Sequence, residues 1–201
     1  MNENNVALIT GSATGVGRAC AVRFAEEGFD IVVNYSRSKE EAHETKALAE
    51  AEGANVLVIQ CDVSDDAAVQ AMIGEVESKW GRLDVLVNNA GTTEFVEHKE
   101  LDEMSEAAWD RILGVNLKGP FFCIRAGAHL LRASDFGAVV NVSSTAGIDG
   151  RGSSVAYCAS KGGLNTMTKS LGRALAPSIR VNAVCPGFNF ITCWFFAFCG
   201  A

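Results

Sequence analysis

The stretch Val6-Ala7-Leu8-Ile9-Thr10-Gly11-Ser12-Ala13-Thr14-Gly15-Val16-Gly17 decides the fold of this chain. It joins a short apolar run to a glycine cluster, and a helical pattern over 17–27 follows at once. Glycines let the backbone approach a pyrophosphate closely, and the free N–H groups and dipole at a helix start attract an anion. The spacing is G-x-x-x-G-x-G, and a glycine cluster alone is also compatible with a plain tight turn. Placed between a buried strand and a helix, it predicts a dinucleotide site.

The same alternation of strand and helix continues along the chain to residue 187. Apolar, β-branched runs predict strands, and between them lie helical patterns with N-cap and glycine stop signals. The expected strands span 6–10, 31–35, 55–62, 83–88, 138–143 and 180–185, and the expected helices span 17–27, 39–52, 65–79, 105–114, 121–133 and 155–175, with a break at Asn116 and Pro120. Because the strands are almost continuously apolar, they are typical of a parallel sheet covered on both faces. We therefore predict a doubly wound α/β Rossmann fold of six strands in one domain, residues 1–187.

Composition restricts the function classes. The 201 residues are 48% hydrophobic and 20% charged, as in one globular domain. A net charge of -7 disfavours a nucleic-acid partner, which needs a basic face, and favours small molecules. No apolar stretch reaches the roughly 20 residues of a membrane span, and the polar N-terminus does not resemble a signal peptide. Seven cysteines without a C-x-x-C pair indicate reduced thiols and a cytoplasmic protein, and the three histidines show no metal-ligand spacing, so no metal is expected.

The end of the second strand decides between NAD and NADP. A carboxylate there would bind the ribose of NAD, whereas a basic residue suits the 2'-phosphate of NADP. Asp30 lies before its strand and therefore at the edge away from the ligand. Residues 34–37 contain no acid and end in Ser36 and Arg37, so NADP is favoured and NAD stays the alternative. Arg37 and Lys39 also have the ordinary interpretation of solvated charges.

A second cluster, Tyr157-Cys158-Ala159-Ser160-Lys161, suggests acid–base chemistry. Tyrosine and lysine at i and i+4 share one face of a helix, so the ammonium can lie near the phenol and favour its ionised form. An unperturbed phenol has a pKa of about 10, and general acid–base catalysis is most efficient when that pKa moves toward the working pH. The same spacing also occurs in helices that hold one half-buried tyrosine and one exposed lysine. The pair therefore needs support from other motifs.

Six motifs in a fixed order supply that support. They are the glycine loop, Asn88-Asn89-Ala90-Gly91, Asn116, Ser143-Ser144, the Tyr157/Lys161 pair and Pro186-Gly187. In this order and setting they are found in the short-chain dehydrogenase/reductase family, and the chain resembles that family from Val6 to Phe188. The resemblance implies an NAD(P)-dependent oxidoreductase that moves a hydride between nicotinamide and a carbonyl or secondary-alcohol substrate.

The resemblance also implies a role for each catalytic residue. Tyr157 would exchange a proton with the substrate oxygen, and Ser144, thirteen residues before it, would hydrogen-bond that oxygen. Lys161 would lower the pKa of the phenol and hold the nicotinamide ribose. Asn116 would hold a water molecule near Lys161. Ser143 is then a strand-end residue.

The cofactor contacts that the resemblance implies come mostly from the ends of strands. The first loop would line the pyrophosphate, the pair after the second strand would contact the phosphate of NADP, the pair after the third strand would meet the adenine, and the residues after the fourth strand would pass along the adenosine ribose. In chain order the contacts are Gly11, Ser12, Thr14, Gly15, Val16, Gly17, Ser36, Arg37, Asp62, Val63, Asn89, Ala90, Gly91, Tyr157, Lys161, Pro186 and Gly187. Thr14 stands where many NADP-preferring relatives carry a basic residue, which leaves Ser36 and Arg37 for the phosphate.

The resemblance defines the substrate less narrowly than it defines the cofactor. Much of the sequence resembles 3-oxoacyl-carrier-protein reductases and glucose or other sugar and alcohol dehydrogenases of the family. Reductases that act on the carrier protein place basic residues before the fifth and sixth strands. This chain has Asp135 and Pro177-Ser178 there, with Arg132 and Arg173 nearby. The fold and the catalytic residues alone do not choose among carbonyl substrates.

Residues 188–201 depart from the rest of the chain. They hold five of the 11 phenylalanines and no charged residue. Relatives continue after Pro186-Gly187 with a lid over the substrate and a last strand, which this aromatic tail does not match, so we expect both to be missing. The alternative hypothesis is a truncated, weakly active or inactive nucleotide-binding homologue that acts through binding or self-association. Family assembly uses the helices at 121–133 and 155–175, which predicts a homodimer or a tetramer.

Overall fold

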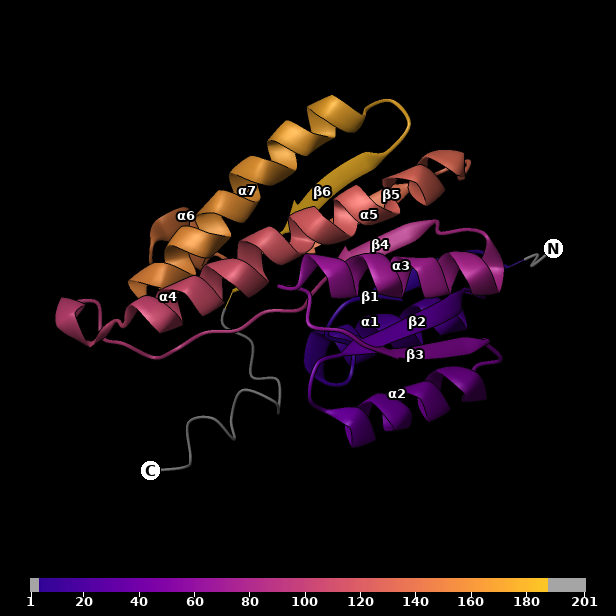
Figure 1. The fold of residues 1–201 in the computed structure, drawn as a ribbon, viewed down its shortest axis with the longest axis horizontal. Coiled ribbons are helices and arrows are strands. Elements are labelled where there is room, and N and C mark those ends of the chain that lie inside the picture. Colours follow the sequence, from indigo (N-terminus) through magenta and orange to yellow (C-terminus); the bar gives the residue numbers. More distant parts are fainter. Residues whose placement is uncertain (1–3, 188–201) are drawn as a thin grey trace.

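The apolar runs of the sequence form the strands of one parallel sheet. The computed structural model describes residues 4–187, and within them the strand order is β3-β2-β1-β4-β5-β6 (Figure 1). The strands are β1 (Val6–Ile9), β2 (Asp30–Tyr35), β3 (Val56–Gln60), β4 (Val85–Asn88), β5 (Ala138–Val142) and β6 (Arg180–Val184). Each begins and ends within two residues of its expected bounds, and the doubly wound α/β prediction is confirmed.

Helices connect successive strands, as a parallel sheet requires. They are α1 (Gly15–Glu26), α2 (Lys39–Ala51), α3 (Asp66–Trp80), α4 (Glu106–Leu113), α5 (Gly119–Ala133), α6 (Ala146–Asp149) and α7 (Val155–Leu175), with a 3-10 turn η1 (Leu101–Glu103) and a π-helical turn η2 (Gly114–Lys118). Asp65 caps α3 by accepting hydrogen bonds from two backbone N–H groups of the first turn, and Ser154 caps α7 by accepting one, from the Tyr157 N–H. The short helix α6 and the two turns were not expected from the sequence.

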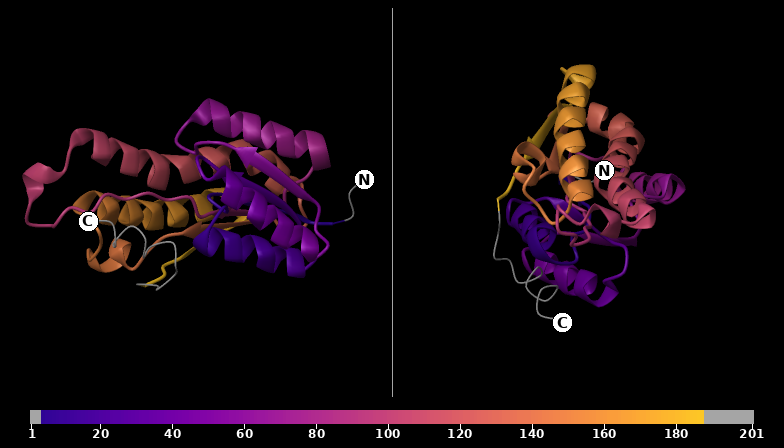
Figure 2. Two further views of the ribbon diagram at one scale, coloured as in Figure 1. Left: turned by 90° about the horizontal axis from the view of Figure 1, so that it is seen from below. Right: turned by 90° about the vertical axis from the view of Figure 1, so that its left-hand side faces the viewer.

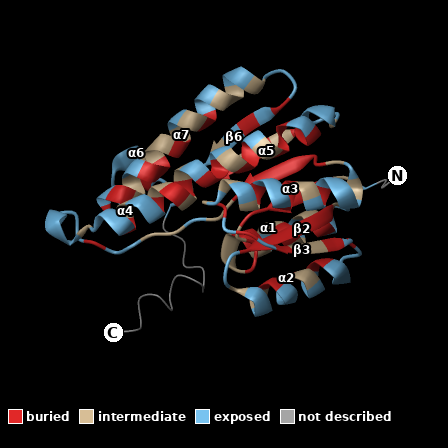
Figure 3. Ribbon diagram, in the orientation of Figure 1, coloured by how far each residue is buried: buried red, intermediate tan, exposed pale blue. Residues whose placement is uncertain are grey.

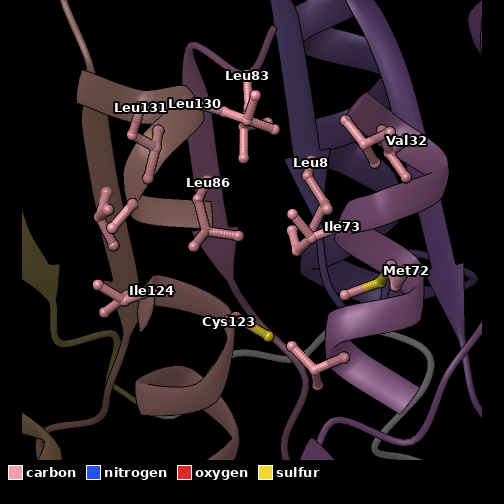
Figure 4. Close-up of a cluster of buried hydrophobic side chains, with 14 of the residues drawn as sticks. Leu8, Val32, Met72, Ile73, Leu83, Leu86, Cys123, Ile124, Leu130 and Leu131 are labelled. Atoms are coloured by element: carbon pink, nitrogen blue, oxygen red, sulfur yellow. The ribbon is translucent and has the colours of Figure 1, made fainter. Parts of the chain in front are cut away.

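Two hydrophobic clusters hold the helices to opposite faces of the sheet (Figures 2 and 3). On one face Leu8 and Leu86 pack against α3 and α5, where Met72 and Ile124 are fully buried (Figure 4). On the other face the strand residues alternate with these, and small alanine side chains of α1 and α2 cover them. Burial on both faces explains why β1, β2 and β4 read as continuous apolar runs, whereas in β5 and β6 buried residues alternate with partly buried or exposed ones.

The expected break at Asn116 and Pro120 is wrong. The helix continues from α4 through η2 into α5, and Figure 1 shows it as one run. A π-helical turn adds one residue to the turn without ending the helix, and Pro120, which has no backbone N–H to donate, lies just after this turn. The insertion turns Asn116 inward, and its side chain is fully buried.

The carboxyl ends of the parallel strands place the predicted site residues at one edge of the sheet. The loops after β1, β4, β5 and β6 all leave the sheet at this edge. No helix in the part of the chain from 4 to 187 has the length and apolar character that crossing a membrane requires. The expectations about the aromatic tail and the missing lid and strand concern residues 188–201, which lie outside the described residues.

Candidate active site

The glycine loop after β1 is fastened to β2. Gly11 and Gly15 have φ of 61° and 58°, a left-handed conformation that favours glycine. The Gly11 N–H donates to Asn34 Oδ1 at 3.0 Å. Ser12 is fully buried, and its Oγ donates to the Ile9 carbonyl at 2.8 Å and accepts from the Asn34 N–H at 3.1 Å. The Ser12 hydroxyl, expected among the cofactor contacts, is therefore used inside the protein to hold the loop.

In the second half of this loop, backbone N–H groups are available as hydrogen-bond donors. Helix α1 begins at Gly15, so the N–H groups of its first turn have no partner within the helix. The N-cap residue Thr14 makes no capping hydrogen bond with its side chain. A Cβ at Gly17 would lie 2.4 Å from the Gly11 carbonyl oxygen and 2.5 Å from Asn89 Nδ2, so only glycine allows this packing. The loop fits the pyrophosphate of a dinucleotide, because it combines unpaired N–H groups with a helix dipole.

Asn89 and Thr10 join the glycine loop to the end of β4. Asn89 Nδ2 donates to the carbonyl oxygens of Thr10 at 2.9 Å and Gly11 at 3.0 Å. In return, Thr10 Oγ1 accepts from the N–H groups of Asn89 and Ala90, both at 3.0 Å. The Asn89 side chain thus clamps the loop, and sequence reasoning missed Thr10 because its partners lie about 80 residues away along the chain.

The residues expected around the adenine end differ in exposure. Asp30 is buried at the amino end of β2, where Asn55 donates to it, so it lies away from the site as expected. Ser36 and Arg37 are exposed after the carboxyl end of β2. Asp62 is exposed and accepts from the Ser64 N–H and hydroxyl. Val63 instead packs its side chain into the core, where a Cβ at Gly119 would lie 2.8 Å from it.

Tyr157, Ser144 and Lys161 meet at the carboxyl edge of the sheet. Tyr157 lies in the first turn of α7, and its side chain is hydrogen-bonded with that of Ser144. Lys161 Nζ lies 5.7 Å from the centroid of the Tyr157 ring. The same ammonium donates to the Val142 carbonyl oxygen at 2.8 Å, and the lysine is only 4% exposed. The structure therefore brings these three side chains together, and Asn116 lies nearby: a Cβ at Gly91 would lie 3.5 Å from Asn116 Oδ1 and 3.8 Å from Lys161 Nζ.

Burial controls the protonation of this pair. It raises the pKa of the Tyr157 phenol, and the hydrogen bond with Ser144 opposes the rise. It also lowers the pKa of Lys161 to about 8. We expect Lys161 to lower the pKa of the phenol, and the burial of the phenol acts in the opposite direction. The reason is that removing water disfavours the phenolate, while the lysine ammonium is directed to a backbone carbonyl and is itself desolvated.

The lowered pKa of Lys161 predicts a pH-dependent stability. Between pH 8 and its unperturbed value of 10.5 the unfolded chain binds more protons at this lysine than the folded chain, so its contribution to stability rises with pH. We expect the free energy of unfolding of the wild type, minus that of Lys161→Met, to rise by about 2 kcal/mol from pH 7.5 to pH 10. Urea unfolding at both pH values measures this difference. A constant difference would contradict the lowered pKa.

Asn116 ties the site together through its amide. Its Oδ1 accepts from the Thr92 N–H at 2.8 Å, and its Nδ2 donates to the Thr92 carbonyl at 2.9 Å and to Ser160 Oγ at 3.1 Å. Ser160 Oγ donates in turn to the Tyr157 carbonyl at 2.7 Å. Asn116 was expected to hold a water molecule near Lys161. The structure gives its side chain a fixed role between the loop after β4 and α7.

The surroundings of the site include two apolar cavities. One of about 180 Å³ lies between the loop after β4 and the start of α7, and its lining includes Val96, Met104, Trp109 and Val155. The other, about 360 Å³, follows the side of α1. Neither is lined by the three clustered side chains.

The last two expected cofactor contacts follow β6. Pro186 accepts a backbone hydrogen bond from the loop after β5, while Gly187 is exposed. Within residues 4–187 there is no cluster of His, Cys, Asp and Glu that could hold a metal ion.

Comparisons with known proteins agree with this arrangement. The family model of the short chain dehydrogenases matches residues 5–192. The 3-oxoacyl-(acyl-carrier-protein) reductase FabG of Staphylococcus aureus is 43% identical over 189 residues, which cover 94% of this chain and 76% of that protein. Among solved structures, a protein assigned to the short-chain dehydrogenases/reductases from Burkholderia xenovorans has a TM-score of 0.92 and 42% identity, covering 94% of this chain and 78% of the other. An NAD+-bound xylitol dehydrogenase has a TM-score of 0.89 and 30% identity, covering 98% and 76%.

Proposed function

The chain belongs to the short-chain dehydrogenase/reductase family, and from this membership we propose that it transfers a hydride between NADP and a carbonyl or secondary-alcohol substrate. The observation that carries the proposal is the hydrogen-bonded pair Tyr157 and Ser144 above the buried Lys161. The alternative, a nucleotide-binding homologue with little or no turnover, predicts NADPH binding without reaction.

The side chains of the site perform the proton part of the reaction. The nicotinamide of the bound cofactor supplies or accepts the hydride. In reduction, the Tyr157 phenol donates its proton to the carbonyl oxygen of the substrate, and its raised pKa keeps that proton available at neutral pH. The Ser144 hydroxyl donates a hydrogen bond to the same oxygen, where negative charge develops. In oxidation, both steps run in reverse.

Lys161 supports the phenol from below. Its ammonium, held at the Val142 carbonyl, lies under the Tyr157 ring and favours the phenolate that remains after proton donation. Because the lysine is nearly inaccessible to solvent, its charge is poorly screened. The residues of the glycine loop would hold the pyrophosphate, and this loop lies at the same carboxyl edge of the sheet as these side chains.

NADP is proposed over NAD because of the chemistry at the end of β2. Residues 34–37 supply an exposed guanidinium and no carboxylate. Within residues 4–187 the Arg37 side chain has no hydrogen bond or ion pair. The xylitol dehydrogenase neighbour is NAD+-bound, so the two cofactors are compared directly.

We expect Arg37→Ala to raise the Kd of NADPH about 10- to 100-fold and to leave the Kd of NADH within about twofold, since a hydrogen bond to a charged group contributes roughly 1.5–3 kcal/mol. Fluorescence titration of both cofactors measures the two constants. The matched control is Arg132→Ala, which removes an equally exposed arginine from the end of α5, at the opposite edge of the sheet. Equal weakening of both cofactors, or tighter wild-type binding of NADH, would contradict the assignment.

For the substrate we propose a small 3-oxoacyl thioester first and a sugar or alcohol second. The FabG relatives support the thioester. Docking of an acidic carrier protein has less support, because Asp135 and Ser178 stand where carrier-binding relatives are basic. Arg173 lies sixteen residues beyond Tyr157 on α7, which is about 24 Å along the helix. A carrier bound at Arg173 of one chain would thus be far from the phenol of the same chain.

The function is tested by following NADPH absorbance with a 3-oxoacyl thioester, a diketone and a sugar. We expect oxidation of NADPH with at least one of them by the wild type. Binding of NADPH without turnover of any of the three would favour the binding-only alternative. The cofactor and the substrate range are read from the same assay, because NADH can replace NADPH in each reaction.

Assembly is proposed as a homodimer through α5 and α7, in a reducing, cytoplasmic location. Phe121 on α5 is 38% exposed, and the Arg125 guanidinium covers this ring and that of Phe122 at 5.5 and 5.3 Å. Such an aromatic surface with an arginine is typical of the centre of an interface.

The five cysteines among the described residues are free thiols, which fits the proposed reducing location.

A further inference from the structure

Three consecutive residues at the end of β5 each hydrogen-bond α7. Asn141 Nδ2 donates to Thr168 Oγ1 at 2.9 Å. The Val142 carbonyl accepts from Lys161 Nζ at 2.8 Å. Ser143 Oγ donates to the Lys161 carbonyl at 3.2 Å. The strand that leads to Ser144 is therefore attached at three points to the helix that carries Tyr157.

Asn141 is the one polar residue in the apolar strand β5. It lies within a buried strand, is fully buried itself, and pairs in register with Asn88 of β4. Asn88 Nδ2 donates to Asn141 Oδ1 at 2.9 Å, and Thr168 Oγ1 donates to the Leu164 carbonyl at 2.7 Å. These polar side chains form a one-directional chain of hydrogen bonds from β4 through β5 to α7.

This chain has an energetic cost that apolar residues would avoid. Burying an amide is unfavourable unless its groups are hydrogen-bonded, and Asn88 Oδ1 has no hydrogen-bond partner among residues 4–187. Valine or leucine at 88 and 141 would bury more apolar area and leave no polar atom unpaired. Stability alone therefore does not account for the polar chain, which points to a role in fixing geometry.

Hydrogen bonds are directional, so they can fix the position of a helix along a sheet. Apolar contact is non-directional, so apolar side chains alone define the position of a helix along a sheet less sharply than hydrogen bonds do. Lys161, Leu164 and Thr168 lie on the face of α7 that meets the sheet, and all are buried. A hydrogen bond from Asn141 to Thr168 sets the position of that face along β5. The same position determines how far the Tyr157 phenol stands from Ser144.

We propose that Asn141 and Thr168 are positioning residues, whose hydrogen bond sets α7 along β5 so that Tyr157 is aligned with Ser144. The proposal rests on the proposed oxidoreductase function. Thr168 follows Tyr157 by eleven residues, about 16 Å along the helix, so it acts through the helix and not by touching the reactants. A displacement of about 1 Å in a reacting group can lower a rate by about 10²-fold.

Three variants separate the effect of the Thr168 hydroxyl on kcat from the effect of the side-chain volume. Thr168→Ser keeps the hydroxyl and loses a methyl group, Thr168→Val keeps the volume and loses the hydroxyl, and Thr168→Ala loses both. We expect kcat to follow the hydroxyl, within about threefold of wild type for Ser and about 10- to 100-fold lower for Val and Ala. The Kd of NADPH should change less than kcat in all three, because the glycine loop, which is expected to hold the pyrophosphate, contacts neither residue. A kcat that follows volume instead, with Val near wild type and Ser impaired, overturns the proposal.

A second measurement does not depend on turnover. The chain has two tyrosines, so in a Tyr35→Phe background the ultraviolet absorbance of tyrosinate reports Tyr157 alone. The hydrogen bond with Ser144 lowers the pKa of Tyr157. We therefore expect the titration midpoint to rise in Thr168→Val and to stay unchanged in Thr168→Ser. An unchanged midpoint in Thr168→Val overturns the positioning role. If the wild type turns over no substrate while this shift is present, the proposed function fails and the positioning role stands.

Discussion

The Tyr157→Phe variant is expected to lower kcat by about 10²- to 10⁴-fold, the range that a positioned proton donor contributes. Phenylalanine keeps the ring, which lies against the Lys161 ammonium, and removes only the hydroxyl that is bonded with Ser144. Folding and NADPH binding should therefore change little. Steady-state rates with saturating NADPH and the best substrate of the panel measure the loss.

Two further observations make this result specific. The Kd of NADPH, measured by fluorescence, should change far less than kcat, because the variant keeps the ring and leaves the glycine loop, which is expected to hold the pyrophosphate, intact. The KM should change less than kcat, because the proton is transferred in the transition state and contributes little to substrate binding. A kcat within tenfold of wild type would show that another group donates the proton, and the assignment of Tyr157 would then be wrong.

The second large effect is expected from Gly17→Ala. The added methyl group would lie 2.4 Å from the Gly11 carbonyl oxygen, 2.5 Å from Asn89 Nδ2 and 2.8 Å from Ser12 Cα. Two of these three atoms are backbone, and the loop around them is held by hydrogen bonds, so the methyl group displaces the loop. We expect a destabilisation of about 1–3 kcal/mol. This corresponds to a Tm lower by about 2–12 °C in a chain of this size. The Kd of NADPH should rise at least about tenfold.

The control for this variant is Gly74→Ala in α3. A Cβ at Gly74 meets nothing within 4 Å, and alanine is favoured over glycine within a helix by about 1 kcal/mol. Its Tm should therefore be equal or higher, and its Kd for NADPH unchanged. Thermal unfolding and fluorescence titration of the two variants side by side make the comparison. Equal behaviour of the two would show that the close packing at Gly17 does not shape the loop.

The sheet and the main helices could be predicted because their signals are local. Buried strands in a parallel sheet read as short apolar runs, and each was followed by a helical pattern with a recognisable start or stop. The π-helical turn could not be predicted, because the residues Asn116 and Pro120 are also those of an ordinary helix end. The only distinction is the tertiary environment that turns Asn116 inward, where it bonds Thr92 and Ser160.

Within the candidate site, the chemistry of a residue could be predicted better than the direction of its side chain. The motifs selected Ser12 and Asn89, but both point into the protein and hold the glycine loop. Thr10 and Asn141 carry no local signal, because their partners lie on other strands or on α7. The direction of the pKa shift at Tyr157 was also beyond the sequence, since it depends on how completely the phenol is buried.

The two faces of the sheet differ in the size of the side chains that cover them. Alanines of α1 and α2, such as Ala21 and Ala42, lie against one face, while leucines, isoleucines and Met72 fill the other. On the alanine face a helix lies close to the strands, so a larger side chain pushes α1 and the loop at its start outward. On the other face a smaller side chain leaves a void. The substitutions that each face tolerates therefore differ in opposite directions: the face covered by α1 and α2 excludes larger side chains, and the face covered by α3 and α5 excludes smaller ones.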